Sequence, residues 1–215
     1  MGDDLLAPLL TSLLAADQRA AQRVVDDALS RGCSVDDVRF RLITPALHAV
    51  GDRWERGEIG VADEHLATSV CEWLLVRMAG RSPRAPASGR RALVGCSEGE
   101  LHALGMRIVA GVLVDAGWSV LYLGAATPAG AWGPIVRARH PDLVVIGTTM
   151  TDALEPVRAT LRAVKSARPE CMTVIGGQAY EAATGAGDRF GADIVSVDAR
   201  ELVGRLGPGR PQNGS

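Results

Sequence analysis

The sequence is poor in aromatic residues and in cysteine, and it lacks a long apolar run. Its 215 residues include four Trp, two Tyr, two Phe and four Cys. No two cysteines form a Cys-x-x-Cys pair, which argues against a zinc site or a disulfide framework and favours buried free thiols. No apolar stretch approaches the roughly 18 residues of a membrane span, and the acidic N-terminus is unlike a secretory signal. We therefore expect a soluble, cytoplasmic protein.

An excess of charge of one sign is also missing. The 23 basic and 25 acidic residues give a formal net charge of −2. Broad binding to nucleic acid or to an anionic membrane usually needs a basic excess, so we expect neither. The hydrophobic fraction of 47% is large enough for a folded core.

The first part of the chain has helical patterns at 5–16, 17–31, 34–54 and 61–78. Ser34 and Asp37 have the spacing of a capping box at the start of the third segment, and Pro45 predicts a kink within it. We expect Trp54 and Leu66 to face the core. The pattern predicts a four-helix bundle, a helical-bundle domain over residues 1–79.

Composition and period then change. Residues 80–90, rich in Gly, Pro, Ser and Arg, predict an interdomain linker. Beyond it, β-rich runs at 91–96, 119–124, 142–147, 172–177 and 193–198 alternate with possible helices at 103–116, 129–139, 152–167 and 179–188. This alternation predicts a flavodoxin-like (Rossmann-like), doubly wound α/β domain with a five-stranded parallel sheet over residues 91–206. Residues 207–215 predict a disordered tail.

Three loops at the carboxyl ends of the expected strands carry small and polar residues. They contain Glu100-x-His102-x-x-Gly105, Gly147-Thr148-Thr149 and Gly176-Gly177. Ligands of open α/β sheets bind at this rim. Several familiar sites are missing, because the chain has no GxxxxGK[ST], no GxGxxG after the first strand and no GxSxG. A phospho-receiver would need a carboxylate at the end of the third strand, where Gly147 and Thr148 stand.

The three loops together resemble the cobalamin-binding domain family, whose pattern is Asp-x-His-x-x-Gly, a later Ser-x-Leu and a final Gly-Gly. The resemblance implies that His102 is the lower axial ligand of cobalt and displaces the cofactor's own dimethylbenzimidazole. Glu100 would orient the imidazole and raise its basicity. The displaced tail would lie beside Gly105, Gly147, Thr148, Thr149, Gly176 and Gly177.

These loops differ from that pattern in two places. Glu100 replaces Asp, and Gly147 and Thr149 replace Ser and Leu, so a hydrogen bond to the tail would come from Thr148, Thr149 or water. A single histidine is more often structural, and glycines often only make turns. The three matched loops in their strand context favour cofactor binding.

The helical part carries a second resemblance, in the spacing Trp54-x9-Glu64-His65. It is similar to the helical cap of CarH-type light-sensing cobalamin regulators, in which the Trp packs over the adenosyl group and the Glu-His pair lies near it. Taken alone, a Trp at this helical spacing is more often a core residue, and a Glu-His pair is more often solvated. The residue after Trp54 is Glu55, where that family often has a His, so a second histidine ligand after photolysis would come from His48 or His65.

Two functions lead at this point, ahead of a mutase subunit fragment or a degenerate domain that binds no cofactor. One is a regulatory module, an adenosylcobalamin photoreceptor that controls transcription through a protein partner, such as a transcriptional regulator, or through self-association. The other is a corrinoid protein that carries a methyl group on methylcobalamin between two enzymes. In both, the chain alone is not an enzyme, because the cofactor carries the chemistry. Few residues precede the first expected helix, so we expect no winged-helix DNA-binding domain and no direct nucleic-acid binding.

Overall fold

A computed structural model of the chain describes residues 3–149, 154–183, 190–196 and 198–206. The chain divides into two compact units, Met1–Pro83 and Arg84–Ser215. The division falls within residues 80–90, the segment whose composition predicts a linker. The tail expected at 207–215 lies outside the described residues.

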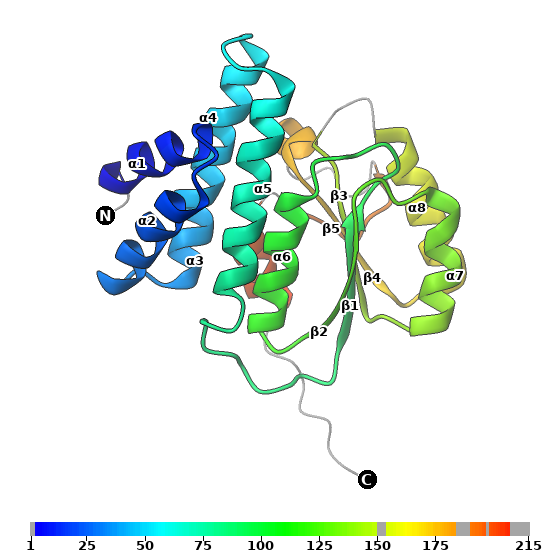
Figure 1. Ribbon diagram of the computed structural model, residues 1–215. Helices are drawn as coiled ribbons and strands as arrows, with labels where there is room; N and C mark the ends of the chain where they lie inside the picture. Colours follow the sequence, from blue (N-terminus) through cyan, green and yellow to red (C-terminus); the bar gives the residue numbers. More distant parts are fainter. Residues whose placement is uncertain (1–2, 150–153, 184–189, 197, 207–215) are drawn as a thin grey trace. The chain divides into compact units, whose positions relative to one another are not determined.

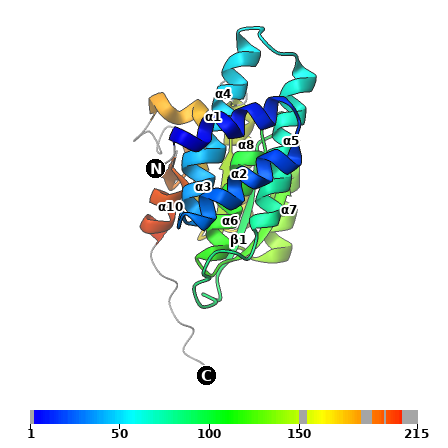
Figure 2. The ribbon, with the colours of Figure 1, turned by 60° about the vertical axis from the view of Figure 1, so that its left-hand side comes forward.

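The N-terminal unit is a helical bundle, seen in Figures 1 and 2. Its elements are α1 (Asp3–Leu14), α2 (Gln18–Ser30), α3 (Val35–Val38), η1 (Arg39–Ile43), α4 (Thr44–Glu55) and α5 (Val61–Met78). The first helix packs against α2, α4 and α5. The carboxylate of Asp17 accepts a hydrogen bond from the backbone N–H of Ala20 and caps α2. The predicted four-helix bundle is confirmed, with its third helix divided into segments.

The third predicted helix is irregular at its middle, with a π-helical segment just before Pro45. Ser34 and Asp37 do form a reciprocal capping box at its start. After one turn, however, the backbone becomes a π-helix over Arg39–Ile43, and α4 begins only at Thr44. Pro45 has no N–H to donate, and it stands directly after the π-helical segment, where the regular pattern of helical hydrogen bonds is already changed. The side chain of Thr44 donates to the carbonyl oxygen of Arg39 at 2.9 Å across this junction.

Two residues expected in the bundle core lie at its surface. Trp54 is 43% exposed and Leu66 is 52% exposed. Trp54 is in the last turn of α4, beside the turn that leads into α5. Leu66 precedes the buried Ala67 by one residue, and one residue rotates a helix by about 100°. The expectation that both side chains face the core is wrong.

The C-terminal unit contains a five-stranded parallel sheet. Its strands are β1 (Arg91–Cys96), β2 (Ser119–Gly124), β3 (Leu143–Gly147), β4 (Met172–Gly176) and β5 (Ile194–Val195). They lie in the order β2-β1-β3-β4-β5, and every described pair is parallel. This is the flavodoxin-like, doubly wound order, which confirms the predicted fold class.

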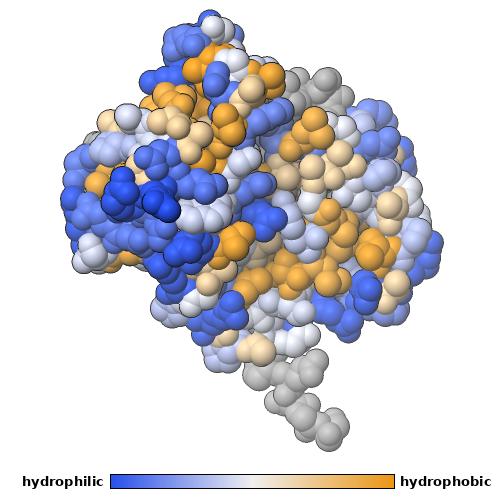
Figure 3. Space-filling model, in the orientation of Figure 1, coloured by the Kyte–Doolittle hydropathy of each residue, from blue (hydrophilic) through white to orange (hydrophobic). Residues whose placement is uncertain are grey.

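Helices cover both faces of the sheet (Figure 1). They are α6 (Leu104–Asp115), α7 (Ala129–Arg139), α8 (Leu154–Ala167) and α10 (Ala199–Leu206). One apolar cluster joins α6 and α10 to the strands, and a second joins α7 and α8 to the other face. The edge strand β2 is only half-buried beyond Ser119, and Figure 3 shows hydrophobic surface in its region.

The segments after β4 depart most from the sequence prediction. Where a helix was expected at 179–188, a 3-10 helix, η3 (Gln178–Ala183), follows β4, and residues 184–189 lie outside the described part. Tyr180 N–H donates to the Gly177 carbonyl, the short-range bond of a 3-10 turn. β5 is shorter than the expected 193–198, although Ser196 N–H still donates to the Ile175 carbonyl. α10 was not anticipated.

The second half of the predicted linker is packed against the α/β unit. Ala85 N–H donates to the Asp115 carbonyl at 2.8 Å, and Ser88 N–H donates to the Gly117 carbonyl at 2.9 Å. Gly117 has a φ of +85°, and a Cβ there would lie 2.3 Å from the carbonyl oxygen of Pro86. A glycine is therefore required where this segment crosses the turn before β2.

The only lysine of the sequence joins three elements at the amino ends of the strands. Lys165 of α8 donates to Asp193 at 2.7 Å and to the Cys171 carbonyl at 2.9 Å. Asp193 also accepts hydrogen bonds from the backbone and the side chain of Thr173. Burial alone would raise the pKa of Asp193, but the hydrogen bonds from Lys165 and Thr173 outweigh it, so this pKa lies below its ordinary value.

We expect Asp193→Asn to lower the free energy of unfolding by about 1 kcal/mol at neutral pH, since the carboxylate is partly exposed. A lowered pKa means that the stabilisation is complete above the unfolded-state pKa of about 3.9 and is lost as pH falls through the folded-state value. Urea unfolding between neutral and acidic pH measures this. Glu155→Gln, which removes an exposed ion pair with Arg158, is the control and should change stability little. Equal effects of the two variants would contradict the assignment.

Candidate functional site

The polar loops after β1 and β3 lie side by side at the carboxyl edge of the sheet. β1 and β3 are neighbours, and β2 lies on the far side of β1, so the chain changes direction between them. This is the topological switch point, where ligands of doubly wound sheets bind. Ser97 N–H donates to the Gly147 carbonyl, which joins the two loops directly.

Glu100 and His102 form a close pair in the loop after β1. The Oε1 atom of Glu100 accepts from the backbone N–H of His102 at 2.7 Å and lies 2.6 Å from its Nδ1. The carboxylate is 1% exposed, whereas the imidazole is 51% exposed. With Nδ1 turned to the carboxylate, Nε2 is the nitrogen with which this ring would coordinate a metal. The extra methylene of Glu, relative to Asp, does not prevent the pairing.

The second oxygen of the carboxylate reaches the loop after β3. Oε2 of Glu100 accepts a hydrogen bond from the backbone N–H of Thr149. The backbone carbonyl of Glu100 accepts from Ala126 N–H at 2.8 Å, which ties in the loop after β2. A buried carboxylate is tolerated only when donors surround it, and these donors come from separate segments of the chain.

Three residues that sequence reasoning missed hold the loop of His102 in place. The hydroxyl of Tyr122, on β2, donates to the Ala103 carbonyl at 2.9 Å, and the guanidinium of Arg107 lies 5.1 Å from the Tyr122 ring centroid. The thiol of Cys96 lies 3.9 Å from the His102 carbonyl oxygen. Burial, and secondarily the charge of Glu100, raises the pKa of Cys96 to about 12, so the thiol stays protonated. An isolated Tyr in a β2 sequence gives no signal of this contact.

The loops after β3 and β4 are joined through Thr148. Its N–H donates to the Gly176 carbonyl at 2.9 Å, and its side chain lies 3.0 Å from the Ser97 hydroxyl, with both hydroxyls buried. Gly177 has a φ of +115°, and a Cβ there would lie 2.2 Å from the Thr148 carbonyl oxygen. The structure thus brings Glu100, His102, Gly147, Thr148, Thr149, Gly176 and Gly177 together in one group of loops.

Gly105 differs from these glycines. It lies in the first turn of α6, and among the residues that the structure describes a Cβ at this position would meet no atom outside its own helix within 4 Å. These residues therefore give no steric reason for glycine here, although glycine weakens a helix relative to alanine.

Trp54 and the Glu64-His65 pair lie at one end of the bundle, where α4 ends and α5 begins. Residues 56–60 connect the two helices. Thr68 donates to Oε1 of Glu64 at 2.8 Å, and Oε2 of Glu64 lies 3.6 Å from Nε2 of the exposed His65. The exposed indole of Trp54 provides an apolar surface at this end that the bundle does not cover.

The chain combines a helical bundle with a flavodoxin-like domain, and that domain has a histidine-carboxylate pair at its switch point. These features together indicate the class of protein. The chain belongs to the B12 binding domain family: the family model for this domain matches residues 90–205. A second model, also described as a B12 binding domain, matches residues 5–75. The protein is therefore a cobalamin-binding protein, and both units belong to the match.

Two kinds of curated relative are similar to the chain. The HTH-type transcriptional repressor CarH of Myxococcus xanthus is 32% identical over 176 residues, which are 78% of this chain and 57% of the repressor. The chain thus spans just over half the length of that relative. Trimethylamine corrinoid protein 2 of Methanosarcina acetivorans is 26% identical over 211 residues, which are 95% of each chain.

The fold also matches solved structures. The monomethylamine corrinoid protein of Methanosarcina barkeri has a TM-score of 0.78 over 96% of this chain and 98% of its own, at 18% identity. At this identity the likeness establishes the fold. Over the ranges that the structure describes, no helix is both long and apolar enough to cross a membrane.

The glycines of the site should separate into two groups when the protein is tested without cofactor. We expect Gly177→Ala to lower the free energy of unfolding by about 1–3 kcal/mol, because its positive φ and the Thr148 carbonyl both oppose a side chain. Gly105→Ala should leave stability unchanged or raise it by up to about 1 kcal/mol. Urea unfolding followed by circular dichroism compares the two. A Gly105 variant as unstable as the Gly177 variant would mean that the protein itself requires Gly105.

Proposed function

We propose that the chain is a regulatory module that holds adenosylcobalamin with His102 as the lower axial ligand of cobalt and responds to light. The observation that carries the proposal is the buried Glu100 carboxylate bound to Nδ1 of the half-exposed His102 at the switch point. A metal-ligating histidine typically has such a carboxylate on its other ring nitrogen, which orients the ring and raises its basicity.

The loops around this pair supply the rest of the proposed site. Thr149 N–H holds the second oxygen of Glu100, so the carboxylate cannot swing away from the imidazole. The displaced nucleotide tail would lie beside the glycines at 105, 147, 176 and 177, with Thr148 and Thr149 as its polar neighbours.

The bundle supplies the proposed cover of the upper ligand. When bound, the cofactor supplies a cobalt–carbon bond, which light can break or which can carry a transferable methyl group. Trp54 offers a flat apolar surface, and the Glu64 carboxylate, held by Thr68, can accept hydrogen bonds from ribose hydroxyls. His65 lies beside that carboxylate. The similarity to the repressor CarH supports a regulatory role, and the resemblance in the spacing of Trp54, Glu64 and His65 implies a cover for the adenosyl form.

Signalling would follow from the contacts that the bundle makes with the upper ligand. Loss of those contacts changes the relative free energies of two arrangements of the chain and so shifts their populations. The change would be passed on through self-association or through a protein partner such as a transcriptional regulator. In this proposal the chain acts in the cytoplasm and binds neither nucleic acid nor membrane directly.

A second function is favoured by a specific observation. The trimethylamine corrinoid protein is similar along 95% of both chains, whereas CarH is similar along only part of its length. The chain would then carry a methyl group on methylcobalamin between two enzymes and would not itself be the catalyst. In this function Trp54 must leave the upper face open to a methyl donor.

Variants of the histidine-carboxylate pair test the binding site that both functions share. We expect His102→Ala to abolish the histidine-ligated absorption spectrum of bound cobalamin and Glu100→Gln to lower affinity about 10–100-fold. Absorption titration measures both. His140→Asn is the control, because His140 has a left-handed backbone that Asn tolerates. An unchanged affinity and cobalt spectrum in His102→Ala would overturn the proposed ligand.

Light separates the two functions. We expect adenosylcobalamin bound in the dark to change its spectrum lastingly under green light, with a shift in size-exclusion elution. Trp54→Ala should keep cobalamin binding but lose the preference for the adenosyl over the methyl form, because the apolar cover is gone. Trp73→Ala, in the same bundle, is the control and should keep the preference.

Two other results would contradict these expectations. Tight methylcobalamin binding with no light-dependent change in mass would favour the methyl carrier. An unchanged adenosyl-to-methyl affinity ratio in Trp54→Ala would remove Trp54 from the site.

A further inference from the structure

Gly147 is the last residue of β3, and a side chain from another element fills the space beside it. A Cβ built on Gly147 would lie 2.4 Å from Cγ of Met106, 2.8 Å from its Sδ and 3.1 Å from its Cε. The Met106 side chain therefore occupies the place that a side chain at 147 would take. Any residue other than glycine at 147 would require Met106 to move.

The other two glycines of the strand ends face fixed atoms. A Cβ at Gly176 would lie 2.2 Å from the carbonyl oxygen of Ser196, and one at Gly177 would meet the carbonyl oxygen of Thr148. Those neighbours are backbone, so the spaces beside Gly176 and Gly177 cannot open without a shift of the backbone. Of these three spaces, only the one beside Gly147 is filled by a flexible side chain.

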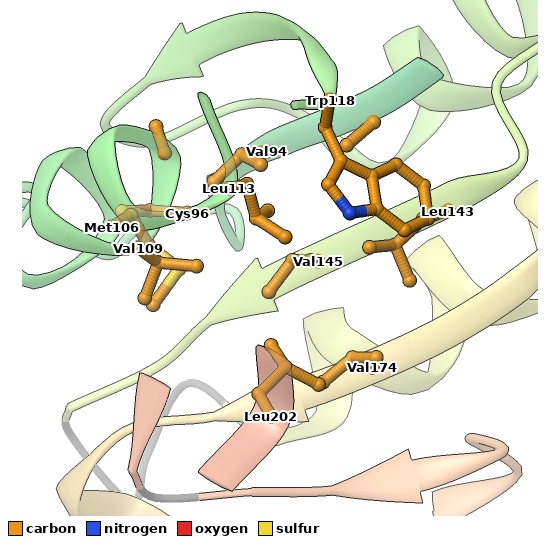
Figure 4. Close-up of a cluster of buried hydrophobic side chains, with 12 residues drawn as sticks. Val94, Cys96, Met106, Val109, Leu113, Trp118, Leu143, Val145, Val174 and Leu202 are labelled. Carbon is orange, nitrogen blue, oxygen red and sulfur yellow. The ribbon is translucent and has the colours of Figure 1, made fainter. Parts of the chain in front are cut away.

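Met106 is well suited to leave that space. It lies on α6 four residues after His102, is 8% exposed, and belongs to the apolar cluster between α6 and the strands. Figure 4 shows Met106, Val109 and Leu113 on the side of α6 that faces the strands. Methionine has three rotatable side-chain bonds and a polarisable sulfur, so it fills irregular gaps and adapts when they change.

We propose that Met106 is a displaceable plug of the slot beside Gly147 and that its volume determines whether the nucleotide arm of a corrinoid can enter. This inference rests on the proposed function, because the arm is the group expected beside Gly147. Entry of the arm would rotate Met106 out of the space against Gly147. The apolar wall that remains, which includes Cys96 and Val109, would contact the base of the arm. Met106 is then a specificity-determining residue and is not a ligand of cobalt.

The test compares two corrinoids, cobalamin and cobinamide, of which cobinamide lacks the nucleotide arm. Met106→Phe puts a larger, stiffer side chain in the slot, so we expect cobalamin affinity to fall about ten-fold while cobinamide affinity changes less than about two-fold. Met106→Ala empties the slot and should speed cobalamin association without affecting cobinamide. Ile108→Val, a change on the same helix at a residue outside this apolar cluster, is the control. Absorption titration and stopped-flow mixing give the affinities and rates.

The outcomes distinguish the plug from the binding site itself. If wild-type protein binds neither corrinoid, the proposed function fails, and the plug fails with it. If wild-type protein binds cobalamin and both Met106 variants alter cobalamin and cobinamide equally, or alter neither, the site stands and the plug is overturned. Should Met106→Phe not fold, Met106→Ala decides alone, because an unchanged cobalamin association rate contradicts the plug.

Discussion

The buried carboxylate of Glu100 is the interaction on which the site depends. A carboxylate taken out of water is costly unless donors replace the water, and here they come from His102 and Thr149. Because one oxygen is bound to the loop after β1 and the other to the loop after β3, the charge fixes the two loops relative to each other. Because the imidazole is bound to this carboxylate, its orientation is fixed as well, as that of a metal ligand needs to be.

At the other strand ends, too, the backbone is fixed, and one side chain there is flexible. Thr148 and Gly176 bond through their backbones, and Gly177 leaves no room for a side chain. Against this rigid frame Met106 is the group that can move. A site of this kind binds with little reorganisation of its backbone, and its selectivity for what enters is set by one side chain.

The residues relevant to cofactor binding and those relevant to the kind of function lie in different units. The α/β unit matches the B12 binding domain family over residues 90–205, and it contains the histidine-carboxylate pair that we propose as the cobalt site. The features that would distinguish a light-responsive regulator from a methyl carrier lie in the bundle, at Trp54, Glu64 and His65. Relatives of both kinds are similar to the chain, so the chemistry of the upper ligand decides between them.

The sequence by itself determined the fold class, because helical and strand periods are local properties of a chain. It also predicted the loops that meet at the switch point, since parallel strands end at one edge. It could not predict the π-helical segment before Thr44 or the exposure of Trp54 and Leu66, because these depend on which neighbours a helix packs against. The Tyr122 contact with Ala103 and the Met106 contact with Gly147 needed the tertiary structure as well. Each joins residues from different elements, and only the folded arrangement brings such residues within contact distance.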